Sequence, residues 1–155
     1  MKRLAWVLLL TGLAGAETPE EILARVAQIH GNAGVFAVAG YRMGERALAD
    51  LGLTRGTFSL RVTHRTPLQV QYSCVADGWQ AATGVSAGKL NLRVVEADRV
   101  ETEAENTKTE TRLVFRLRPD FVDRYLNTPF PDQARVSRQV LELKDEEIFE
   151  VTSSP

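Results

Sequence analysis

Residues 58–74 read FSLRVTHRTPLQVQYSC and contain the pattern that determines the fold class of this protein. Apolar and polar side chains alternate over residues 58–65, and they alternate again over residues 68–74 after Pro67. Alternation with a period of two is the pattern of a strand with one buried face. The two runs therefore predict a β-hairpin, which excludes a purely helical protein.

Helical patterns lie on both sides of these strands. Residues 18–30 begin with Thr18 as an N-cap and place Glu21 where a capping box needs it, and residues 35–51 form a second, Ala-rich helix. Further predicted elements are a short helix at 75–82, strands at about 90–95, 99–105 and 111–118, and helical segments after Pro119 and Pro131. This order predicts an α+β fold with N-terminal helices, a central mostly antiparallel sheet and C-terminal helical segments.

Composition narrows the class of protein further. A chain of 155 residues with 44% hydrophobic and 25% charged residues is the size and make-up of one globular domain. Its 19 basic and 20 acidic residues provide no basic surface for nucleic acid. A single cysteine excludes an intramolecular disulfide and a cysteine-only zinc or iron–sulfur cluster within one protomer.

The first residues, 1–16, have the pattern of a signal peptide. Lys2 and Arg3 precede an apolar run that is about half as long as a membrane-spanning helix requires, and Ala16 ends a small-residue cleavage site. The sequence predicts cleavage there and a mature domain of 17–155. We expect this domain to be exported to the periplasm or the extracellular space, to be free of the membrane, and to carry a net charge of −3 once the two basic residues are removed.

Two groups of polar residues are candidates for chemistry. His30 and Asn32 surround a glycine at the end of the first helix, where a cap or a surface side chain is the alternative interpretation. Cys74, Asp77 and Gln80 follow one another at intervals of three residues, near one side of a helix start. Helix amides acidify a thiol at that position, whereas a buried cysteine behaves as a small hydrophobe.

A glycine-flanked loop ends in Lys89 but is not a nucleotide-binding P-loop. Only three residues separate Gly84 from Gly88, and Leu90 takes the place where the P-loop has Ser or Thr. The sequence therefore does not predict an ATP site.

Two further residues are assigned to packing. His64 falls on the apolar face of its predicted strand, which favours a core or edge histidine over a ligand. Trp79 is interpreted as a filler of the core or of an interface.

Taken together, these motifs resemble the formylmethanofuran dehydrogenase E-subunit family. The blocks that carry the resemblance are 30–31, 40–44 (GYRMG), 74–84 (C-x-x-D-x-x-Q-x-x-T-G) and 88–92 (GK-x-NL), followed by the acidic end at 145–151. The resemblance spans residues 30–151. Many family members carry a C-terminal zinc-finger module, for which we expect no counterpart here.

The resemblance implies a metal site built from His30, Cys74 and Asp77, for zinc or another divalent metal. Other family donors and their supporting residues are replaced in this chain, so a retained three-ligand site and a pocket without metal both remain open. The replaced positions are Asn32, Gly34, Val35 and Val85.

Two functions from different classes follow. The preferred one is a non-catalytic exported domain that binds a metal ion or small ligand in a pocket near His30 and Cys74. The alternative is a small thiol- or metal-dependent enzyme in which Cys74 is nucleophile or ligand, Asp77 orients and His30 is the general base. The residues expected to contact the ligand are Asn32, Tyr41, Gln80, Lys89 and Asn91.

A homodimer is expected from the second predicted helix. Gly40 and Gly44 suit a close helix contact between protomers, and relatives with this fold tend to self-associate.

Overall fold

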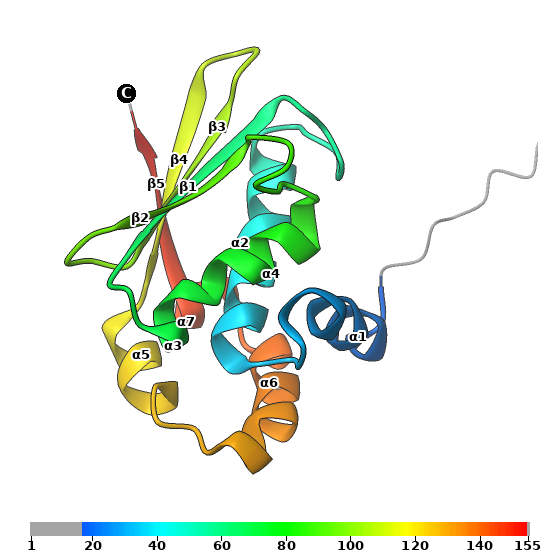
Figure 1. Ribbon diagram of the computed structural model, residues 1–155, viewed down its shortest axis with the longest axis vertical. Helices are drawn as coiled ribbons and strands as arrows, with labels where there is room; N and C mark the ends of the chain where they lie inside the picture. Colours follow the sequence, from blue (N-terminus) through cyan, green and yellow to red (C-terminus); the bar gives the residue numbers. More distant parts are fainter. Residues whose placement is uncertain (1–16, 155) are drawn as a thin grey trace, which may run out of the picture.

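The computed structural model describes residues 17–154 (Figure 1), so the predicted signal peptide lies outside the described residues. The elements in chain order are α1 (Pro19–His30), α2 (Val35–Asp50), β1 (Leu60–Thr66), α3 (Val70–Ser73), α4 (Val75–Thr83), β2 (Leu92–Glu96), β3 (Glu101–Asn106), β4 (Thr111–Leu117), α5 (Pro119–Tyr125), η1 (Phe130–Asp132), α6 (Gln133–Glu142), α7 (Asp145–Ile148) and β5 (Phe149–Ser154). The predicted α+β class is confirmed.

The sheet has five strands in the order β2-β1-β3-β4-β5. Only the β1–β2 pair is parallel, and the other three pairs are antiparallel, as the sequence predicted for most of the sheet. Leu60, Val62 and His64 of β1 are buried on the face that packs against the helices. Figure 1 shows α2 and α4 running along one side of the sheet.

The predicted hairpin is wrong. After β1 the chain passes Pro67 and enters the short helix α3 instead of a second strand. Both edges of β1 are occupied by β2 and β3, so residues 68–74 have no edge left to pair with. The apolar side chains of Leu68 and Val70 consequently remain 67% and 73% exposed.

Glycines allow α2 and α4 to pack at very short range. A Cβ atom on Gly78 would lie 1.9 Å from the carbonyl oxygen of Ala37, and one on Gly40 would lie 2.1 Å from that of Val75. A Cβ atom on Gly44 would meet α4 as well. The close contact predicted between protomers is therefore made inside one chain. The homodimer stays a prediction, which gel filtration tests.

The two N-terminal helices begin and end as their sequences indicate. Thr18 and Glu21 form the predicted capping box of α1, and Gly31 ends that helix with a φ of 91°. Glycine adopts this left-handed conformation without steric cost, so the chain can turn sharply into α2. Within residues 17–154 no single helix is long and apolar enough to cross a membrane. The pair α1 and α2 passes on length and composition only together, bent by 111°.

Trp79 and His64 are core residues, as predicted. The Trp79 ring packs edge-on against Phe115 at a centroid distance of 5.2 Å. His64 is fully buried, and its Nε2–H donates to the carbonyl oxygen of Tyr72 at 3.0 Å while its Nδ1 accepts from the Thr102 hydroxyl at 2.8 Å. Because Tyr72 belongs to α3, His64 fastens α3 to the sheet.

Candidate ligand pocket

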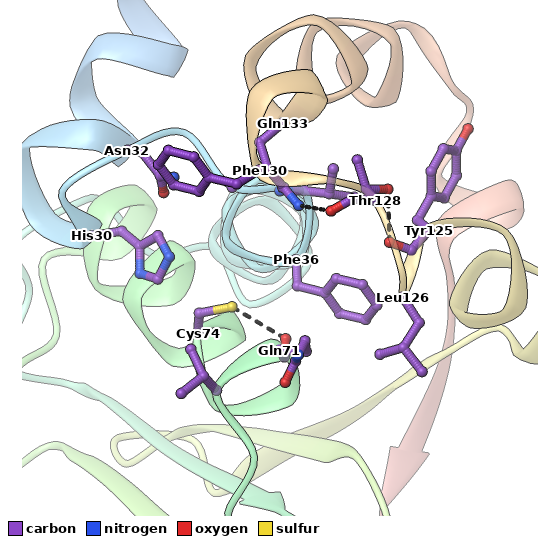
Figure 2. A pocket seen from close by; sticks show the side chains of 13 residues that line it. His30, Asn32, Phe36, Gln71, Cys74, Tyr125, Leu126, Thr128, Phe130 and Gln133 are labelled. Carbon is purple, nitrogen blue, oxygen red and sulfur yellow. Dashed lines mark hydrogen bonds between the residues drawn. The ribbon is translucent and has the colours of Figure 1, made fainter.

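A pocket of about 300 Å³ lies where the turn between α1 and α2 faces α3 and the segment that joins α5 to α6. Figure 2 shows the side chains that line it. Its polar lining includes His30, Asn32, Gln71 and Cys74, and its apolar lining includes Phe36, Leu126 and Phe130. The structure thus places three of the predicted site residues, His30, Asn32 and Cys74, in the wall of one pocket.

His30 is held in a defined orientation by Asp77. Its Nδ1 lies 2.7 Å from an Asp77 carboxylate oxygen. An ionised carboxylate only accepts hydrogen bonds, so Nδ1 carries a proton, and in the singly protonated form of the ring Nε2 is left as an acceptor. A Cβ atom on Gly34, which also lines the pocket, would lie 3.4 Å from that Nε2. The free nitrogen of His30 therefore faces the pocket wall at Gly34.

Cys74 contributes a protonated thiol. Its Sγ donates to the carbonyl oxygen of Gln71 at 3.1 Å. Burial, with a smaller contribution from the Asp77 carboxylate, raises the pKa of the Cys74 thiol to about 12. Of the two interpretations of Cys74, the structure favours the buried small hydrophobe. Helix α3 runs almost directly into α4, and Cys74 itself has helical backbone angles rather than lying at a free helix end.

The apolar wall comes from residues distant in sequence. Phe36 is fixed by edge-on contacts with Tyr72 and Phe121, at centroid distances of 6.1 and 5.8 Å. Gln133 links the start of α2 to the segment between α5 and α6. Its Oε1 accepts from the Val35 amide at 2.9 Å, and its Nε2 donates to the carbonyl oxygen of Thr128. Sequence reasoning missed this wall.

Lys89 and Asn91 lie away from the pocket, at the other end of α4. The Lys89 ammonium donates to the carbonyl oxygen of Gly84 at 2.9 Å. Buried Asn91 donates to the carbonyl oxygen of Leu60 and accepts from the amide of Ser86, both at 3.0 Å. These contacts fix the loop that leads into β2, so the structure does not bring the two residues to the predicted ligand site.

Tyr41 and Gln80 also lie outside the pocket lining. The Tyr41 hydroxyl donates to the Glu17 carboxylate at 2.6 Å, which ties the start of the described chain to α2. Gln80 is on α4, one turn beyond Asp77, and is half-buried. Of the five residues expected to contact the ligand, only Asn32 lines the pocket.

Comparison with known proteins assigns the chain to a family. The family model described as FmdE, molybdenum formylmethanofuran dehydrogenase operon, matches residues 29–153. The chain belongs to the FmdE family. No curated protein matches this FmdE-family chain.

The FmdE fold is also found in a solved structure. The crystal structure of a tungsten formylmethanofuran dehydrogenase FmdE-like protein from Syntrophus aciditrophicus superposes with a TM-score of 0.59. The two sequences are 16% identical, and the match covers 90% of this chain and 73% of the other. At this identity the likeness extends to the fold.

The donors of this FmdE-family chain do not form the three-ligand zinc site considered from its sequence. Asp77 is turned to the Nδ1 of His30, which leaves that ring's Nε2 and the Cys74 thiol. Across residues 17–154 no group of three His, Cys, Asp or Glu side chains is placed to hold a metal ion. Val85 stands beyond the far end of α4, a nine-residue helix about 13 Å long, so a cysteine there would not have completed the set. Zinc sites have three or four protein ligands.

Proposed function

We propose that this protein is an exported, non-catalytic domain that holds a small organic ligand in the pocket at His30 and Cys74. One observation carries the proposal. His30 is oriented by Asp77, yet within residues 17–154 its Nε2 has no protein partner, and it adjoins a mostly apolar pocket. Ligand sites of proteins typically combine an apolar lining with a few oriented polar groups. The pocket has both.

The state of Cys74 argues against the thiol-enzyme alternative. A catalytic cysteine attacks as a thiolate, and its surroundings lower its pKa. Here burial and the Asp77 carboxylate raise the pKa of the thiol, and the S–H bond points to a backbone carbonyl. Cys74 therefore serves as part of the pocket wall.

The ligand test uses a variant that fills the pocket. Gly34 has a φ of −69° and a ψ of 150°, which any residue adopts, so Gly34→Leu should fold and place its side chain at the pocket wall. We expect a fragment library, screened by saturation-transfer NMR, to give binders that Gly34→Leu loses. Gly88→Leu, on an exposed loop, is the matched control that should keep them. Fragments that bind all three proteins alike, or none at all, would refute the ligand pocket.

Elemental analysis separates the organic ligand from a metal ion. We expect the untagged protein and Cys74→Ser to contain zinc at well below one equivalent. Gly34→Cys adds a third donor beside His30 Nε2 and should raise zinc binding. If the natural protein contains one equivalent of zinc and Cys74→Ser loses it, the site binds a metal ion and the organic-ligand proposal is wrong.

Export rests on the signal-peptide pattern of residues 1–16. We expect the full-length chain, expressed in a bacterium with an outer membrane, to be recovered from the periplasm with Glu17 as its first residue. Terminal sequencing and mass determination read this directly. An uncleaved chain in the cytoplasmic fraction would contradict export and leave the pocket proposal untouched.

A further inference from the structure

The pocket contains no fixed charge. Within the described part of the chain, none of its lining side chains is Lys, Arg, Asp or Glu. The nearest carboxylate, that of Asp77, is already engaged by His30. A charged ligand would lose its hydration without gaining a partner of opposite charge, which is costly. The pocket therefore selects for an uncharged ligand.

His30, which Asp77 orients, offers the ligand a hydrogen-bond acceptor. Since the His30 Nδ1–H is committed to Asp77, the Nε2 atom can only accept a hydrogen bond when the ring carries one proton. The Cys74 S–H is committed to Gln71. A ligand that brings an O–H group to His30 would give the Nε2 of this ring, whose orientation Asp77 fixes, the hydrogen bond that no described residue supplies.

Two aromatic side chains in the pocket lining, Phe36 and Phe130, suit a flat ring. Phe36 is locked in place by two aromatic neighbours, and Phe130, 77% exposed, extends over the pocket lining from η1. Figure 2 shows Phe36 and His30 on either side of Cys74. Aromatic side chains gain from offset or edge-on contacts with other rings. A volume of about 300 Å³ equals roughly ten water molecules, which is enough for one or two fused rings.

We propose that the ligand is a neutral phenol, whose ring packs against Phe36 and Phe130 and whose hydroxyl donates to His30 Nε2. This inference rests on the proposed function and gives its chemical class. A phenol has a pKa near 10, so it enters the pocket uncharged at neutral pH.

Calorimetry with four probes of one shape tests the class at pH 7. 4-Methylphenol should bind most tightly, and 4-methylanisole, which lacks the donor, should bind about tenfold more weakly, the effect of one buried hydrogen bond. The charged analogues 4-methylbenzoate and 4-methylbenzylamine should bind more weakly still. Tighter binding of either charged probe would overturn the assignment.

Two variants locate the contacts. His30→Ala should make 4-methylphenol and 4-methylanisole bind equally, whereas Phe130→Ala should weaken both by the same factor. In the natural protein, the ¹⁵N shift of His30 Nε2 should move with 4-methylphenol and not with 4-methylanisole, which tests the contact even if His30→Ala misfolds. A phenol preference that survives in His30→Ala, or an unmoved Nε2 signal, would overturn the inference.

Failure of this class is distinguishable from failure of the proposed function. If the four probes do not bind but library fragments bind and are lost in Gly34→Leu, the pocket is a ligand site for another class and the phenol is wrong. If neither probes nor fragments bind, both proposals fail.

Discussion

Polar residues of the family blocks gather at the two ends of α4 and are used in opposite ways. At the N-terminal end, Asp77 orients His30, which lines the pocket together with Cys74. At the C-terminal end, the Thr83 hydroxyl donates to the backbone within α4, and Lys89 donates to backbone carbonyls of the adjoining loops.

This contrast separates residues that can bind a ligand from residues that hold the fold. Asn91 is buried and has backbone partners for both its oxygen and its nitrogen, so it stabilises a loop. Among the described residues, His30 has one partner for two ring nitrogens. Polar groups left unpaired at a pocket are the ones available for binding.

The largest effect is expected from breaking the helix contact that supports both ends. Gly78→Ala would place a Cβ atom 1.9 Å from the backbone of α2, so the helices must separate. We expect a loss of more than about 3 kcal/mol in the free energy of unfolding, measured by urea denaturation. Gly88→Ala, which meets only the Ser86 hydroxyl at 4.0 Å, should stay within about 0.5 kcal/mol of the natural protein.

The thiol at the N-terminal end should be unreactive. With a pKa of about 12, Cys74 is almost entirely protonated at pH 8. We expect iodoacetamide to alkylate the native protein at least about a hundredfold more slowly than the urea-unfolded chain, whose thiol has a pKa near 8.5. Native alkylation as fast as in urea would restore the enzyme alternative.

A pair of asparagines contrasts the two ends directly. Asn91→Ala leaves a buried carbonyl and an amide without partners, which should lower the free energy of unfolding by about 2 kcal/mol. Asn32→Ala, in the pocket wall, should change stability by less than about 0.5 kcal/mol. Denaturant titrations of both variants measure this. Equal losses would erase the distinction between the ends.

A smaller effect should appear at the pocket end on acidification. Burial lowers the pKa of His64, so below about pH 6.5 the unfolded chain binds a proton that the folded chain does not. The contribution of His64 to the free energy of unfolding is fully present above that pH. Below it, this contribution should fall by up to about 1.4 kcal/mol per pH unit. Urea denaturation at pH 7.5 and 5.5 should give a larger decrease for the natural protein than for His64→Gln. The same decrease in both would exclude His64 as its source.

Local patterns predicted the local structure well. The capping box of Thr18 and Glu21 is present, and the alternation of residues 58–65 is mostly that of β1. The strand predicted from the same alternation over residues 68–74 is absent, because β2 and β3 occupy both edges of β1. Which strand takes an edge is decided by the whole fold, and a short window of sequence does not contain that information.

The sequence predicted the polar side of the candidate site but not the wall formed by the segment between α5 and α6. His30, Asn32, Cys74 and Asp77 were found from their types and spacing, and the structure brings them together around one turn and one helix start. Phe130 and Gln133 come from a segment about a hundred residues away from His30. Their sequence reads as an ordinary helix start, so nothing local marks them as a pocket wall.

The most direct test of the contrast between the ends of α4 is an NMR titration of the ¹⁵N-labelled protein with 4-methylphenol. We expect the backbone amide shifts to change at residues 30–36, 70–74 and 125–133 around the pocket, and to stay unchanged at 84–91. Shift changes confined to 84–91 would contradict this assignment, because they would place the binding site at the end whose polar groups are already paired.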